Sequence, residues 1–307
     1  MPITRREFCE ISVAAASSLT AAVSLCAPKP QAFQLNYIVA SAMYGKAPLE
    51  TILAELPNSG ARSIEIWAER HGNQREQIDE MGEERFRELL DQNGVKLGSL
   101  TCFKYGIFNM QSEMQLTKRL GGGMVICNSG GKKGLSRDDL KREVKAFAEK
   151  LKPTVELTES LEISIGVENH SGGLISSPES IFLLFDELPS SSIGLAMAPY
   201  HLPQDPSQIA EIIHKLGDRL VHFQAWEHGM GCMEKLPKEQ EMLQLPHRGP
   251  LDFVPIVAAL KETNFQGRTE VFMHPVPRGI PILPDLSDVT REIKAGHEYL
   301  EDCLAKS

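Results

Sequence analysis

The stretch ISIGVENH, residues 163–170, shows the strand pattern from which the fold can be predicted. It runs apolar for five positions and then turns polar at Glu168, Asn169 and His170, with SGG directly after. A short, nearly continuous apolar run bounded by turn residues is typical of a strand that is buried on both faces. The polar end of the strand has two interpretations. It is either an ordinary strand terminus or part of a functional site.

Short apolar runs of the same kind recur along the chain and alternate with amphipathic stretches. The runs span residues 35–43, 62–69, 96–103, 123–129, 163–169, 192–198, 219–226 and 268–274. Eight strands, each followed by a helix, predict an α/β fold, the closed parallel (β/α)8 TIM barrel. A doubly wound open sheet is the alternative.

The intervening stretches carry helix signals. Ile209, Ile212, Ile213 and Leu216 form an apolar stripe at helical spacing. Ser177 followed by Pro178 is typical of a helix start. The stretches 252–263 and 288–306 are predicted to form the last two helices.

Residues 33–307 show no break in composition, so we expect a single barrel domain. The long insert at 227–251, between the seventh strand and its helix, is a candidate lid, because loops of this length tend to be functional or disordered.

Residues 1–32 differ from the rest of the chain. Arg5 and Arg6 precede an apolar run at 11–27 that is rich in small residues. This arrangement resembles a twin-arginine export signal and predicts a cleaved leader and a periplasmic protein. An N-terminal helix packed on the domain is the alternative, and tethering through an uncleaved or lipidated leader is disfavoured. We expect no stable membrane insertion after the leader is removed.

The charge and the cysteine content argue against two other classes of protein. The formal net charge of −9 opposes a nucleic-acid partner, since such proteins need a basic face. Cys102, Cys127, Cys232 and Cys303 contain no CxxC pair, which argues against a structural zinc site. We expect them to be small buried residues without a disulfide framework.

Acidic and imidazole side chains follow several of the predicted strands. Because the carboxyl ends of barrel strands meet at one mouth, Glu168, His222 and Glu270 are expected to converge there. Two carboxylates and an imidazole suit a divalent metal ion such as manganese, magnesium, cobalt or zinc. Taken singly, each has an ordinary explanation: a solvated glutamate at 168, a hydrogen-bonded core histidine at 222, or an ion pair between Glu270 and Arg268.

At GVENHSGG, LVHFQAW and GRTEVF the chain resembles the xylose-isomerase-like TIM-barrel superfamily, the sugar phosphate isomerase/epimerase family. The resemblance covers essentially all of residues 33–307. It implies that Glu168, His222 and Glu270 hold one divalent ion and that Glu168 and Glu270 are catalytic, moving a proton next to a sugar carbonyl. It further assigns a sugar-contacting role to His201.

The sequence departs from that pattern in two places. Ala198 stands where the sugar epimerases have a metal-binding Asp, and Gln224 and Ala225 replace a Lys-Asp pair. The loss of one anionic ligand predicts weaker metal binding. We expect Lys104 to contact sugar hydroxyl groups as well, and Trp226 either to wall the sugar site or to pack in the core.

The leading hypothesis is therefore a metal-dependent isomerase or epimerase acting on a small sugar or polyol. The departures at Ala198 and Gln224 motivate a second, an exported carbohydrate-binding protein without turnover. A third is a lyase or hydrolase acting on an oxidised sugar. The sequence leaves the metal, the substrate and the oligomeric state open, a homo-oligomer included.

Overall fold

The computed structural model describes residues 32–228 and 236–307. Residues Gln34–Ser307 form one compact unit built on a closed parallel barrel in which each strand pairs with the next and β8 pairs with β1. The strands are β1 Tyr37–Ala40, β2 Ser63–Trp67, β3 Lys96–Thr101, β4 Met124–Asn128, β5 Ser164–Glu168, β6 Ile193–Met197, β7 Leu220–Ala225 and β8 Arg268–Val271. All eight predicted strands and the TIM-barrel fold are confirmed.

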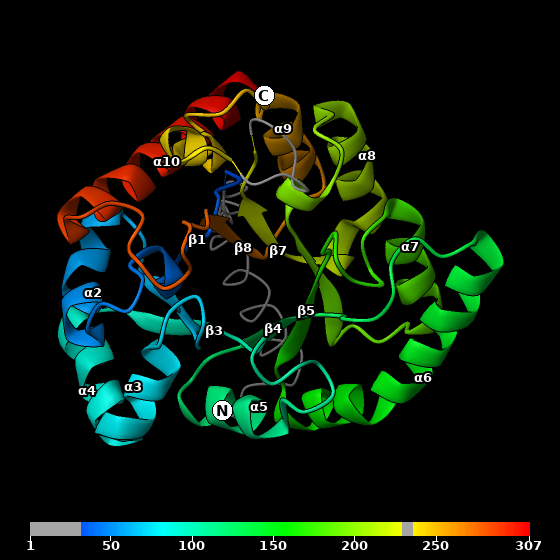
Figure 1. Cartoon of the computed structure of the whole chain (residues 1–307), viewed down its shortest axis with the longest axis horizontal. Coiled ribbons are helices and arrows are strands. Elements are labelled where there is room, and N and C mark those ends of the chain that lie inside the picture. Colours follow the sequence, from blue (N-terminus) through cyan, green and yellow to red (C-terminus); the bar gives the residue numbers. More distant parts are fainter. Residues whose placement is uncertain (1–31, 229–235) are drawn as a thin grey trace, which may run out of the picture. The chain divides into compact units, whose positions relative to one another are not determined.

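Helices surround the barrel, as Figure 1 shows in the view along its axis. The α-helices are α2 Leu49–Glu55, α3 Gln74–Met81, α4 Glu83–Asn93, α5 Gln111–Arg119, α6 Arg137–Leu161, α7 Pro178–Glu187, α8 Pro206–Leu216, α9 Val254–Glu262 and α10 Leu286–Lys306. Short 3-10 helices include η3 Pro199–His201 after β6 and η5 Lys238–Gln244 after β7. This outer layer buries the second face of each strand, which explains why the strand sequences are largely apolar.

The local signals read from the sequence have the expected structural roles. Ser177 caps α7 in a capping box with Ser180, and Pro178 is the first residue of that helix. The stripe of α8 is buried, with Ile209 and Ile213 fully enclosed. The predicted helices at 252–263 and 288–306 correspond to α9 and α10.

The long insert after β7 is tied to the barrel in its described part. Glu227 accepts a hydrogen bond from the Leu251 amide, and Gln244 of η5 accepts one from the Trp226 indole. Residues 229–235 lie outside the described part of the chain, so a lid role for the whole insert stays a prediction.

Three of the cysteines expected to be buried, Cys102, Cys127 and Cys303, are buried and free. The predicted export leader falls on residues outside the described ones and stays a prediction. Among the helices that the described residues form, none has both the length and the apolar character that crossing a bilayer requires.

Candidate metal and sugar site

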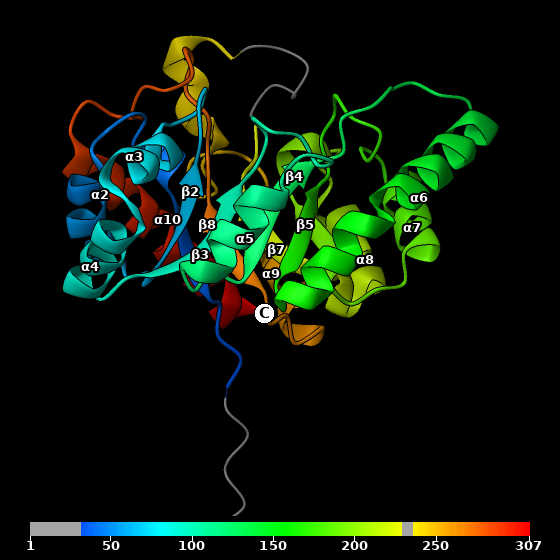
Figure 2. The ribbon, with the colours of Figure 1, turned by 90° about the horizontal axis from the view of Figure 1, so that it is seen from below.

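A pocket of about 680 Å³ opens where the carboxyl ends of the strands meet. This is the end at which the loops after each strand gather, opposite the barrel end that carries the C-terminus in Figure 2. The pocket is lined by Glu69, Arg70, His71, Phe103, Lys104, Asn128, Glu168, His170, Ser171, Tyr200, His201, Trp226, His274 and Arg278.

A first cluster of potential ligands, called the inner group here, consists of Glu65, His222 and Glu270. They come from β2, β7 and β8, and their donor atoms lie within 4.8 Å of one another. His222 Nε2 is 3.6 Å from Glu270 Oε2 and 3.7 Å from Glu65 Oε2. All three are completely buried and do not line the pocket. They lie within their strands, deeper in the barrel than the strand ends where the sequence placed them.

Neighbouring hydroxyl groups hold Glu65 in the barrel. Ser99 Oγ donates to Glu65 Oε2 at 3.1 Å, and Thr101 Oγ1 donates to Glu65 Oε1. Burial, together with the charge of Glu270, raises the pKa of Glu65 to about 8, although His222 opposes this shift. Carboxyl groups packed in this way need a proton or a cation between them.

The inner group fits a divalent cation. Neither ring nitrogen of His222 has a hydrogen-bond partner among the described residues, and Glu270 Oε1 lacks one as well. Buried polar atoms without partners are rare and call for an explanation such as an ion. Ligands bound at about 2.1 Å in a tetrahedral site stand roughly 3.4 Å apart, close to the separations around His222.

Glu168 occupies a different position from His222 and Glu270. It is the last residue of β5, is almost fully buried and lines the pocket. Burial raises the pKa of Glu168 well above its ordinary value, and the charges of Glu65 and Glu270 add to the effect. Gln224 contacts Glu168 and lowers that pKa. It also donates to Glu270 Oε2 at 3.5 Å, so one amide lies between the two predicted catalytic carboxylates.

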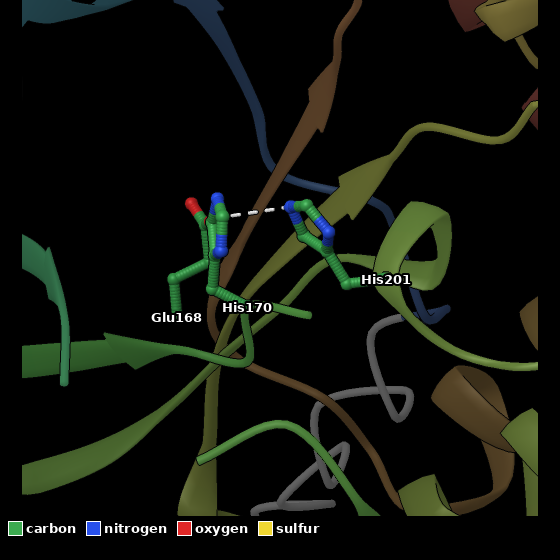
Figure 3. Close-up of side chains that lie close together, drawn as sticks. All are labelled: Glu168, His170 and His201. Carbon is green, nitrogen blue, oxygen red and sulfur yellow. Dashed lines mark ion pairs between the residues drawn. The ribbon is translucent and has the colours of Figure 1, made fainter. Parts of the chain in front are cut away.

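A second cluster, called the outer group here, consists of Glu168, His170 and His201, whose donor atoms also lie within 4.8 Å of one another. Figure 3 shows the His201 ring facing Glu168 and His170 across the end of β5. The three ligands proposed from the sequence, Glu168, His222 and Glu270, are thus divided between the two groups. The charges of Glu65 and Glu270 act on Glu168, but its carboxylate belongs to the outer group.

Ala198 is the first residue after β6 and is completely buried. The Asn169 side chain accepts from the Ala198 amide at 2.8 Å and donates to its carbonyl at 3.0 Å. The backbone is therefore held beside the outer group, while the methyl side chain offers no ligand.

The predicted sugar contacts His201, Lys104 and Trp226 all line the pocket. Trp226 stacks flat on Tyr200, with ring centroids 3.9 Å apart. It therefore packs against another side chain and also forms part of the pocket wall. Lys104 is half-exposed and paired with Glu76 at 2.6 Å. Lys104 thus lies at the rim of the pocket, and the Glu76 carboxylate already balances its charge.

Sequence reasoning did not assign Glu65 or His170 a role as ligands. For Glu65 a signal exists, because an acid in the centre of the five-residue run SIEIW would otherwise be costly to bury. His170 is the last residue of the stretch ISIGVENH, but its position in the sequence does not show that its ring contacts the ring of His201.

In the metal-free protein, Glu65 should make the free energy of unfolding fall as pH rises. Its folded pKa of about 8 exceeds the ordinary 4.5, so the fold retains a proton that the unfolded chain has lost between these values. From pH 6.5 to 8 the part of the loss that is due to Glu65 is about 2 kcal/mol. Because histidines also titrate near pH 6.5, this part is taken as the difference between wild type and Glu65→Gln.

Urea denaturation with EDTA at both pH values measures this effect. Glu65→Gln should remove that part of the pH dependence, whereas the control Glu84→Gln, at an exposed position, should keep it. Equal pH dependence in wild type and Glu65→Gln would contradict the assignment.

Known proteins share this architecture. The chain is 26% identical over 112 residues to D-psicose 3-epimerase of Enterocloster bolteae, a match that spans 36% of this chain and about a third (33%) of that relative's length. Its structure is similar to that of IolI protein with a bound zinc atom (TM-score 0.69, 16% identity, 89% of this chain and 99% of the other). It is also similar to D-psicose 3-epimerase with D-tagatose from Clostridium cellulolyticum H10 (TM-score 0.68, 13% identity, 88% and 99%).

At these identities the structural similarities establish the fold. Family membership rests on the sequence: residues 53–303, most of the chain, match the family described as xylose isomerase-like TIM barrel. The chain belongs to the xylose isomerase-like TIM-barrel family.

Proposed function

We propose that the protein is a metal-dependent sugar isomerase or epimerase that moves a proton next to the carbonyl of a small ketose. The observation that carries the proposal is the group of buried carboxyls around His222, directly next to a pocket of sugar size. The similarity to ketose 3-epimerases supports the choice of substrate class.

The proposed ion is held by His222 and Glu270, with Glu168 as the third ligand predicted from the sequence. Glu65 adds a carboxylate beside them, which offsets the charge lost at Ala198. When bound, a divalent ion supplies Lewis acidity that polarises a carbonyl and acidifies the neighbouring C–H bond.

Glu168 is assigned the role of the proton acceptor that meets the substrate, and its position in the pocket lining supports this. In the metal-free protein burial raises the pKa of Glu168, and the proposed exchange uses its carboxylate as the base. Glu270 is assigned the return of a proton to the opposite face of the carbon. Because Glu270 is fully buried and bonded to Gln224, the Gln224 amide has to swing aside before this exchange.

His201 and Trp226 have positioning roles in the proposal. His201 Nδ1 is hydrogen-bonded to Ser171 Oγ at 3.1 Å, which fixes the ring at the pocket floor. Trp226 presents an apolar face next to it, with ring centroids 5.2 Å apart. A sugar bound there has one apolar face covered and its hydroxyl groups within reach of polar side chains.

Solvent deuterium exchange tests the proposal. The metal-stripped protein is supplied in D₂O with Mn²⁺, Co²⁺, Zn²⁺ or Mg²⁺ and with fructose, psicose, tagatose or ribulose. Metal-dependent deuterium incorporation next to the carbonyl, followed by ¹H NMR, is the expected result. The absence of metal binding at millimolar concentration in a folded protein would end the proposal.

A carbohydrate-binding protein without turnover is the second candidate, favoured by Ala198 and by the Gln224 bridge between the carboxylates. It predicts saturable sugar binding in calorimetry without deuterium incorporation. Loss of water or cleavage of an oxidised sugar in the same NMR spectra would instead identify the lyase or hydrolase alternative.

A further inference from the structure

The outer group has the geometry of a metal position in its own right. Glu168 ends β5, His170 follows it by two residues, and His201 closes the 3-10 helix after β6. All three line the pocket, unlike the members of the inner group. An ion bound among them would therefore be reachable from solvent and by a ligand.

The gap between His201 and Glu168 is the first argument. His201 Nε2 lies 3.6 Å from Glu168 Oε1, too far for a hydrogen bond. The His201 side chain is about 5% exposed, and Nε2 has no hydrogen-bond partner among the described residues. Two electron-pair donors that face each other across this distance leave room for an ion with bonds of about 2.1 Å.

The hydrogen bond on the other His201 nitrogen is the second argument. Ser171 Oγ lies 3.1 Å from Nδ1, and when this hydroxyl accepts, the ring proton stays on Nδ1. The Nε2 lone pair then points towards Glu168. A fixed tautomer of this kind is how metal-binding histidines are usually held.

His170 supplies the third donor. Its ring lies against that of His201, with centroids 4.1 Å apart and planes at 38°. His170 Nδ1 now accepts from the Gly172 amide at 3.1 Å. Because a ligating imidazole has its proton on the other nitrogen, an ion on either nitrogen releases the Gly172 amide. That amide is exposed and passes to water at little cost.

We propose that Glu168, His170 and His201 form a second divalent-metal position at the floor of the pocket. Two imidazoles and one carboxylate favour zinc or a similar imidazole-preferring ion over magnesium. Three protein ligands leave a coordination position open towards the pocket, as in catalytic zinc sites. Glu168 is shared with the ion proposed for the inner group, whereas His170 and His201 belong to this position alone, which adds a place where sugar oxygens or water bind.

Metal stoichiometry tests the proposal directly. The tag-free full chain is stripped with chelator, and Zn²⁺ binding is measured by calorimetry and elemental analysis. Wild type should bind two equivalents. His170→Gln and His201→Gln should each lower the affinity for one of the two Zn²⁺ ions by about 100-fold or more. His222→Gln should lower the affinity for the other ion.

His71→Gln is the matched control. His71 lines the same pocket and stacks on His274, with ring centroids 4.4 Å apart, but belongs to neither group. This variant should keep both equivalents. Circular dichroism checks the fold of every variant, and His170, which is only half-buried, is the substitution expected to perturb packing least.

Electron paramagnetic resonance gives a second readout that does not depend on stoichiometry. Cu²⁺ added to His222→Gln should show hyperfine coupling to two nitrogens, and the coupling should fall to one in His170→Gln/His222→Gln. Wild-type Zn²⁺ binding in folded His170→Gln and His201→Gln would overturn the second position. Failure of the proposed function is a separate result, namely two bound equivalents without deuterium exchange on any sugar.

Discussion

Glu168→Gln should lower the rate of deuterium exchange on an accepted ketose by about 10³-fold, with the fold intact. The amide keeps the volume of the side chain but cannot take a proton, and positioned acid–base groups contribute about 10² to 10⁴ in rate. Glu270→Gln should cause a comparable loss, because the proposed exchange uses both carboxyls. NMR at saturating metal and sugar measures the rate for each variant.

Glu227→Gln is the matched control for these two variants. Glu227 is a buried carboxyl whose pKa burial raises to about 8, and it accepts a hydrogen bond from the Leu251 amide. It does not line the pocket, and a glutamine oxygen preserves that hydrogen bond. Exchange at the wild-type rate in Glu168→Gln, or an equal loss in Glu227→Gln, would remove Glu168 from the proposed chemistry.

Ala198→Asp should tighten divalent-metal binding by about 10- to 100-fold. Ala198 is fully buried next to the outer group, so a carboxylate there adds an anionic ligand where water cannot compete. Without metal the same carboxylate should destabilise the fold by a few kcal/mol, because a buried charge without a partner is costly. Addition of metal should reverse this loss.

Calorimetry and thermal unfolding with and without Zn²⁺ or Mn²⁺ measure both effects. Ala198→Asn is the control, since it has the same shape without the charge. The Asn169 bonds reach only the backbone of residue 198, so both variants should keep them. Equal metal affinity in Ala198→Asp and Ala198→Asn would show that residue 198 does not face a bound ion.

The barrel could be predicted from the sequence because its signals are local. Each strand is a short apolar run, and Ser177 with Pro178 starts a helix through contacts within one turn. Burial on both faces makes the eight runs conspicuous, and their alternation with helices admits few topologies.

The site could be predicted only in part, because its grouping depends on distances between strands. The sequence identified Glu168, His222 and Glu270, but which carboxyl meets which imidazole depends on how deep each lies along its strand. Glu65 and His222 lie inside their strands, whereas Glu168 is the last residue of β5. Gln224, noted in the sequence as a lost charge, is in the structure a bridge that contacts two carboxylates.

The closure of β8 onto β1 has a practical consequence. Both strands run towards the pocket, so β1 starts at the far end of the barrel. The C-terminus, which follows α10, lies at that same end (Figure 2). Immobilising the protein on a sensor chip through its C-terminus would therefore direct the pocket into the flow, away from the chip surface, so that the surface does not block access to it.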